Sequence, residues 1–124
     1  MRNYRVTFAD VVAAHDEALT YGGRRGVVSE ASIRSAIGRP YSGYHHFIYN
    51  KAAALLQAIV QNHGFVDGNK RTALLATELL IRRSGYTLHL AEDEYFDDLI
   101  VSVAEGLVDY SELCEWFQAR LHRA

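Results

Sequence analysis

Nine consecutive residues near the middle of the chain combine side chains suited to phosphate chemistry. The segment from His63 to Arg71 reads HGFVDGNKR and supplies a base, a carboxylate at Asp67, a glycine turn at Gly68 and two cations, of which Lys70 is the first. Both cations fall in the first turn of a predicted helix, where the positive end of the helix dipole disfavours positive charge by roughly 0.3–1 kcal/mol. We therefore expect an anion at this point, because free N–H groups at a helix N-terminus bind phosphate.

ATP with Mg²⁺ would supply that anion, and each residue type then has a role. Asp67 offers an oxygen ligand to Mg²⁺, which takes one or two protein carboxylates and completes its shell with phosphate and water. Main-chain N–H groups around Asn69 and Lys70 would surround phosphate oxygens, and the Asn69 side chain would add a hydrogen bond or cap the helix. Arg71 would stabilise charge on the transferred group, and His63 would act as general base towards an attacking hydroxyl.

Each of these residues also has an ordinary structural explanation. A histidine at a helix end is commonly structural, and Asp67 and Asn69 are common turn formers. Lys70 or Arg71 would then simply pair with Asp67 at the surface. Such separate explanations do not account for a base, a carboxylate, a glycine and two misplaced cations within nine residues, so we favour the chemical interpretation.

The flanking sequence predicts the two helices that must hold this segment. From Ile48 onward, apolar residues recur every three or four positions, which keeps one face apolar and puts His63 at the end of a core-facing stripe. Gly64 is predicted to be a left-handed helix cap, and Phe65 to point inward and anchor the loop. The helix after Gly68 is apolar almost all round, which is typical of a central helix.

The remaining patterns indicate an all-α fold. The sequence predicts about six helices, over 7–20, 29–38, 48–63, 69–84, 92–105 and 109–122. Residues 86–90 alternate like a short strand, and residues 41–47 are expected to form a loop or a small β-hairpin. Because no repeat or linker interrupts the chain, residues 1–124 are expected to form one compact helical bundle.

Composition narrows the functional class. A net charge of -2 and a pI near 6.3 argue against direct binding of nucleic acid, which relies on a basic face. Cys114 is the single cysteine and is expected to be a small buried hydrophobe. The chain starts without the apolar region of a signal peptide and has no stretch suited to a membrane span, so we expect a cytoplasmic protein.

Two further motifs are not predicted to bind phosphate or metal. The glycine-rich segment 21–26 contains Arg24 and Arg25, and we interpret it as a solvated turn because no predicted strand precedes it, as a phosphate loop would require. His45 and His46 are adjacent in an aromatic loop with no third ligand at a suitable spacing, so a metal site is not expected there.

The central motif resembles that of the Fic/Doc superfamily, and specifically its Doc branch of bacterial toxins. The Fic motif reads HPFxxGNGR with a further arginine three residues later, whereas this chain has Gly64 for the proline, Lys70 for the second glycine and Leu74 for the further arginine. The Doc form, DGNKR or DANKR, matches Asp67 to Arg71 directly. The resemblance extends over about residues 50–85 and implies the compact helical Fic fold.

The departures from the Fic motif bear on the reaction. In Fic enzymes the glycine and arginine at the positions of Lys70 and Leu74 orient ATP to deliver its α-phosphate, so that AMP is transferred. The resemblance to Doc implies that ATP binds reversed and delivers its γ-phosphate to a threonine of elongation factor Tu. It also implies roles for the motif residues, with His63 as base, Asp67 as Mg²⁺ ligand, and Gly68, Asn69, Lys70 and Arg71 as phosphate cradle.

The resemblance also implies partners. Residues 41–47 look like the family's flap, which aligns an extended target by main-chain pairing. Self-inhibitory Fic proteins carry the signature (S/T)xxxE(G/N), and the nearest string here, from Ser102 to Gly106, is one residue too short. A separate antitoxin is therefore implied, with a C-terminal helix that binds in a groove near the site.

Three functional hypotheses follow. The leading one is a Doc-like protein kinase toxin that arrests translation. The second is a nucleotidyl transferase that still transfers AMP despite Lys70, and the third is a catalytically weak module that binds an antitoxin or another partner.

Overall fold

The computed structural model describes residues 3–124, and the fold in this part of the chain is mainly helical. Its elements in chain order are α1 (Phe8–Ala18), α2 (Glu30–Gly38), a 3-10 helix η1 (Arg39–Tyr41), α3 (Ile48–Asn62), α4 (Asn69–Arg83), β1 (Tyr86–Leu88), α5 (Phe96–Ala104), α6 (Tyr110–Arg120) and β2 (Leu121–Arg123). The prediction of an all-α fold with about six helices is confirmed for these residues.

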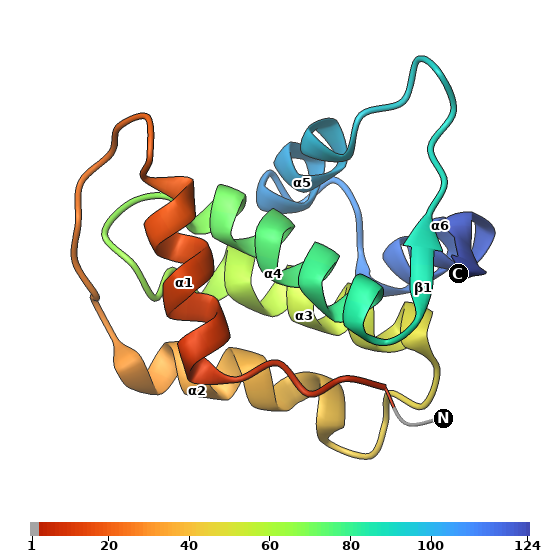
Figure 1. Cartoon of the computed structure of the whole chain (residues 1–124), viewed down its shortest axis with the longest axis horizontal. Helices are drawn as coiled ribbons and strands as arrows, with labels where there is room; N and C mark the ends of the chain where they lie inside the picture. Colours follow the sequence, from red (N-terminus) through yellow and green to blue (C-terminus); the bar gives the residue numbers. More distant parts are fainter. Residues whose placement is uncertain (1–2) are drawn as a thin grey trace.

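The helices α3 and α4 lie side by side at the centre, with α1 and α2 on one side and α5 and α6 towards the other (Figure 1). The buried face of α3 contains alanines that allow close packing of neighbouring helices, together with Leu55 and Leu56, which are fully buried. Burial of each such leucine contributes about 1.5–3 kcal/mol. The segment that joins α3 to α4 is therefore held between two rigid helices.

Side-chain caps begin three helices where the sequence predicts them. Thr7 and Asp10 form a capping box at α1, because the Thr7 hydroxyl accepts from the Asp10 N–H at 3.1 Å and the Asp10 carboxylate accepts from the Thr7 N–H at 3.0 Å. Ser29 caps α2, and Asp109 caps α6. Caps of this kind contribute about 0.5–2 kcal/mol each.

The small β-sheet does not include residues 41–47, where a β-hairpin was one of the two predicted alternatives. Strands β1 and β2 pair antiparallel, with Thr87 opposite His122. Residues 42–47 are an irregular loop, and His45 in this loop contacts Tyr110 of α6. The loop alternative is confirmed and the hairpin is wrong there, because the described backbone makes no strand pairing at 42–47, where Tyr44, His46 and Phe47 are exposed.

Helix boundaries differ from the prediction at α1, α5 and α6, and α1 ends at Ala18, two residues before the predicted end. The fifth helix begins at Phe96, because Glu94 accepts a hydrogen bond from the Ala91 N–H and bonds to Arg120, which keeps 91–94 in a turn. The last helix ends at Arg120, since Leu121 has extended backbone and starts β2. Cys114 is buried, as predicted.

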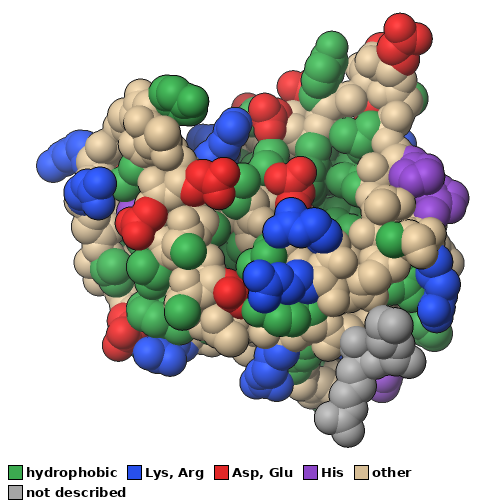
Figure 2. Space-filling view, viewed as in Figure 1, with side chains coloured by type: hydrophobic (Ala, Val, Ile, Leu, Met, Phe, Trp, Pro, Cys, Tyr) green, Lys and Arg blue, Asp and Glu red, His purple; other side chains and the backbone are tan. Residues whose placement is uncertain are grey.

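The surface over α1 and α4 carries both signs of charge, with acidic and basic side chains next to one another (Figure 2). Asp10 and Glu17 of α1 lie across a shallow depression from Arg82 and Arg83 of α4. In the described residues, no helix has the length and apolar character that a membrane span requires.

Candidate active site

The joint between α3 and α4 starts with an unusual backbone conformation at His63. This residue ends α3 with φ 47° and ψ 50°, and it is the one non-glycine residue with positive φ among residues 3–124. Left-handed backbone at a non-glycine residue costs roughly 1–3 kcal/mol and is concentrated at functional sites. The prediction that Gly64 is the left-handed cap is wrong, and His63, expected at the end of the core-facing stripe, is exposed to solvent instead.

Gly64 is required for a different reason, which is space. A Cβ at this position would lie 2.4 Å from Cγ1 of Ile33 on α2. The Gly64 carbonyl accepts hydrogen bonds from the N–H groups of Val28 and Ser29, at 2.8 and 3.1 Å. The missing side chain therefore lets α2 and the preceding segment pack directly against the joint.

Phe65 and Asn69 close the loop on itself. The Phe65 side chain is buried, as predicted, and its main-chain N–H donates to Oδ1 of Asn69 at 3.1 Å. Nδ2 of Asn69 donates back to the Phe65 carbonyl at 2.9 Å. Asn69 is thus the first residue of α4, and its side chain holds the loop closed. The N-cap residue is Gly68, which has φ 78° and provides no side-chain cap.

The carboxylate of Asp67 is oriented by two main-chain N–H groups. Gly68 donates to Oδ1 at 2.8 Å, and Arg24 of the glycine-rich turn donates to Oδ2 at 3.1 Å. These two hydrogen bonds hold the pKa of Asp67 below its ordinary value. The side chain is exposed and each oxygen keeps a free lone pair, so this donor suits Mg²⁺, which prefers carboxylate oxygen and few protein ligands.

Lys70 and Arg71 lie in the first turn of α4, as predicted, and both are exposed. Nη1 of Arg71 lies 3.9 Å from Oδ2 of Asp97 on α5. Among residues 3–124, no ion pair joins either cation to Asp67. The ordinary explanation, in which these cations neutralise Asp67, therefore does not describe this structure.

All six residues predicted to form the site line one cleft of about 390 Å³, at the N-terminus of α4. The cleft has a polar wall and an apolar wall. The polar wall consists of His63, Asp67, Gly68, Asn69, Lys70, Arg71 and Asp97, and the apolar wall consists of Val60, Val66, Leu74, Ile100, Val101 and Ala104. A cleft of this size accommodates a small ligand with a charged part and an apolar part.

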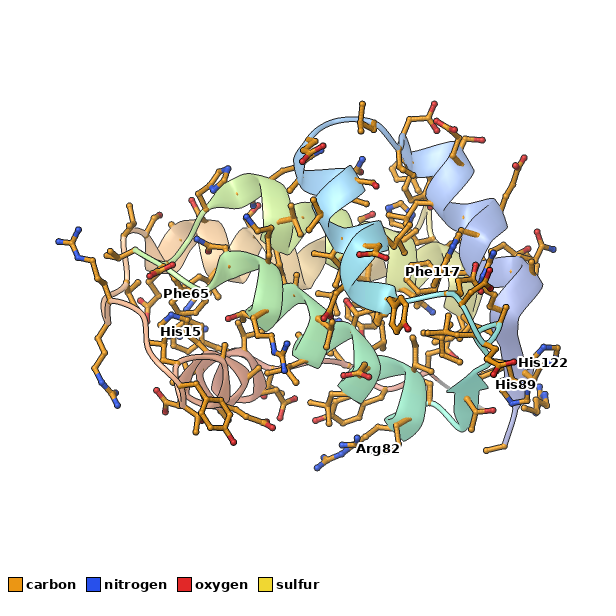
Figure 3. The ribbon with its side chains drawn as sticks, turned by 90° about the horizontal axis from the view of Figure 1, so that it is seen from above. His15, Phe65, Arg82, His89, Phe117 and His122 are labelled. Atoms are coloured by element: carbon orange, nitrogen blue, oxygen red, sulfur yellow. The ribbon has the colours of Figure 1, made fainter. Side chains whose placement is uncertain are left out.

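Sequence reasoning missed three groups that contact the motif, and one of them is Asp97, which pairs with Arg71. Arg24 holds Asp67 through its backbone, which no side-chain pattern reveals. His15 on α1 is buried and stacks on Phe65 with ring centroids 3.8 Å apart, and the two rings lie together in Figure 3. Its place four residues after Val11, on the buried face of α1, is the signal that would have indicated it.

The helical fold and this cleft place a candidate base beside two exposed cations at the N-terminus of α4. The model of the Fic/DOC family matches residues 5–81, and the chain belongs to this family. The toxin Doc of Mycolicibacterium smegmatis is 33% identical over 93 residues, which cover 70% of this chain and 72% of that protein. The protein kinase doc of Escherichia phage P1 is 30% identical over 111 residues, 86% of each chain. The resemblance to Fic/Doc enzymes is confirmed.

Proposed function

We propose that this protein is a Doc-type toxin that acts as an ATP-dependent protein kinase in the cytoplasm. It transfers the γ-phosphate of ATP to a hydroxyl side chain of a translation factor, with elongation factor Tu as the proposed substrate, and so arrests translation and growth. The observation that carries this proposal is the single cleft that brings His63, Asp67, Lys70 and Arg71 together at the N-terminus of α4. The relative named as a protein kinase supports it.

The proposed reaction needs one proton transfer and one phosphoryl transfer. His63 accepts the proton of the attacking hydroxyl, the hydroxyl oxygen bonds to the γ-phosphorus, and the bond from that phosphorus to the bridging oxygen breaks, which releases ADP. N–H groups at the start of α4, with Lys70 and Arg71, bind the phosphates. Positioning and electrostatics supply most of the rate enhancement in phosphoryl transfer, and the cleft offers both.

Asp67 is the proposed ligand of Mg²⁺. When bound, the metal would neutralise charge on the phosphates. The chain contributes a carboxylate that two N–H groups keep in one orientation and whose pKa is lowered, so it is ionised at neutral pH. Because this carboxylate is already ionised and oriented, its side chain loses little conformational freedom when the metal binds.

Lys70 is the main argument for phosphate transfer over AMP transfer. The side chain stands at the start of α4, on the polar wall of the cleft, where the Fic motif has a glycine. Leu74 on the apolar wall stands where the Fic motif has a second arginine. Both differences remove features that hold ATP for delivery of its α-phosphate, so AMP transfer is the second candidate function.

An antitoxin is the proposed regulatory partner, with a C-terminal helix that binds in a groove near the site. The relative named as toxin Doc supports a partner of this kind. The apolar wall formed by Leu74, Ile100 and Val101 would accept the apolar face of such a helix. A catalytically weak module that only binds this partner is the third candidate.

A labelling experiment tests the proposal. The purified protein is incubated with bacterial lysate and with ATP labelled at either the α- or the γ-phosphate. Label transferred only from the γ-position, and lost when Asp67 is changed to alanine, is the expected result. Label transferred from the α-position would support AMP transfer, and transfer from neither position would support the binding module.

A further inference from the structure

His15 is a buried side chain that the proposed reaction does not use directly. It lies on α1, is 6% exposed, and contacts Phe65 and Asp67 in the joint between α3 and α4. Its Nε2 lies 2.8 Å from the main-chain carbonyl oxygen of Asp67. Because a carbonyl oxygen only accepts, Nε2 must carry a hydrogen and donate it.

The bond from His15 fixes the carbonyl of a peptide group whose N–H donates a hydrogen bond to the Asp67 carboxylate. The carbonyl of Asp67 and the N–H of Gly68 belong to the same planar peptide unit. That N–H donates to Oδ1 of Asp67 at 2.8 Å, while the carbonyl accepts from His15. Rotation of this peptide would break both hydrogen bonds at once.

Gly68 is the residue that would permit such a rotation. It has φ 78° and lacks the Cβ that restricts backbone movement. His15 lies close beneath it, since a Cβ on Gly68 would be 3.7 Å from Nε2 of His15. The ring of His15 is itself held by the stack on Phe65, with an interplanar angle of 10°.

We propose that His15 is a positioning residue that locks the Asp67–Gly68 peptide, and thereby orients the Asp67 carboxylate towards the metal and phosphate. This inference rests on the proposed function for the identity of the ligand. Groups that orient a metal ligand through a hydrogen bond commonly change metal affinity by about 10–100-fold when removed. The N–H of His15 is the part of the ring that performs this role.

Two substitutions separate the hydrogen bond from the stack. His15→Phe keeps an aromatic ring against Phe65 but has no N–H, whereas His15→Gln loses the ring but places an amide N–H near the position of Nε2. Leu113→Val on α6 removes a buried methylene far from the joint and serves as a control for general loss of stability.

The first measurement is amide hydrogen exchange of Gly68 in the free protein, compared with amides in α3. In His15→Phe we expect exchange of the Gly68 amide at least about tenfold faster, with α3 changed no more than in Leu113→Val. His15→Gln should stay near wild type. Unchanged Gly68 exchange in His15→Phe, or equal acceleration in both His15 variants, would overturn the proposal.

The second measurement is the affinity for Mn²⁺ in the presence of a non-hydrolysable ATP analogue. We expect about 10–100-fold weaker binding in His15→Phe and recovery in His15→Gln. Equal affinity in wild type and His15→Phe would contradict the positioning role. A wild-type protein that binds no metal–nucleotide would refute the proposed function, while the exchange comparison would still decide the role of His15.

Discussion

The main-chain N–H of Arg24 donates a hydrogen bond to Oδ2 of Asp67 at 3.1 Å, which ties the glycine-rich turn to the proposed metal ligand. The same turn pairs with the motif through its backbone, since Val66 N–H donates to the Gly26 carbonyl at 2.9 Å. In Figure 1 these two segments run beside each other at the end of the helical core. The turn is therefore part of the support of the site.

Removal of the Asp67 charge should abolish phosphate transfer without unfolding the protein. In Asp67→Asn we expect transfer of γ-label to fall by at least about 100-fold, because one neutral amide replaces the carboxylate ligand. The protein should remain folded, because the site is exposed and the amide oxygen of asparagine can still accept one of the two main-chain hydrogen bonds. The matched control is Asp16→Asn on α1, an exposed carboxylate that faces Arg25. Equal activity of Asp67→Asn and Asp16→Asn would rule out the metal role.

Lys70 should be needed for γ-phosphate transfer. Lys70→Met keeps the length of the side chain but removes a charge-assisted contact to phosphate, and we expect a rate about 10–100-fold lower. Lys51→Met provides the control, because Lys51 lies over the Tyr41 ring and outside the cleft. Steady-state rates with γ-labelled ATP test this, and a wild-type rate in Lys70→Met would remove the main argument against AMP transfer.

The joint between α2 and the motif should not tolerate a side chain at Gly64. Gly64→Ala places a methyl group 2.4 Å from Cγ1 of Ile33, and we expect a loss of about 1–3 kcal/mol in the free energy of unfolding. Gly38→Ala is the matched control, since no atom lies within 4 Å of its new Cβ, and it should gain about 0.5–1 kcal/mol. Urea unfolding measures both. Equal stability of the two variants would contradict this prediction and show that α2 shifts to accommodate the added methyl group.

The free energy of unfolding should decrease as the pH drops below about 6.5. Burial, together with the positive charges of Arg39, His46 and Lys51, lowers the pKa of His45 from its ordinary value of 6.5. The neutral ring accepts a hydrogen bond from the Tyr110 hydroxyl at 2.6 Å. Because the unfolded chain binds the proton more tightly, this contribution is complete above the unfolded pKa and is lost as the pH falls through the folded pKa.

The variant His45→Gln tests this assignment, because it cannot take up a proton in this range. Its free energy of unfolding should depend less on pH than that of wild type between pH 7.5 and about 5. Urea titrations at several pH values measure the difference. Parallel pH profiles for the two proteins would assign the dependence to another group.

Much of the fold could be predicted because local rules and burial agree. The caps at Thr7, Ser29 and Asp109 define helix starts, and the apolar face of α3 determines which side is buried. The two errors at α5 and α6 have a tertiary cause. The bond between Glu94 and Arg120 joins residues far apart in sequence, so a local charge pattern at 92–94 could not reveal it.

The sequence indicated which motif residues line the cleft, but not the contacts that hold them in place. The motif indicated six of the seven residues from His63 to Arg71 that line the cleft, all except Val66, because their types and spacing suit a helix N-terminus. The left-handed conformation of His63 could not be predicted, since an adjacent glycine is the usual choice and Ile33 is what requires the glycine at position 64. The hydrogen bonds from Arg24 and His15 both involve a backbone partner, which sequence patterns do not record.

The most direct test of the central claim is the mass of purified elongation factor Tu after incubation with this protein, ATP and Mg²⁺. We predict the addition of one phosphate to a hydroxyl side chain. The rate should fall by about 10²–10⁴-fold in His63→Asn, which keeps a residue that tolerates left-handed backbone but removes the base. Addition of AMP, or no change in mass with wild-type protein, would contradict the account.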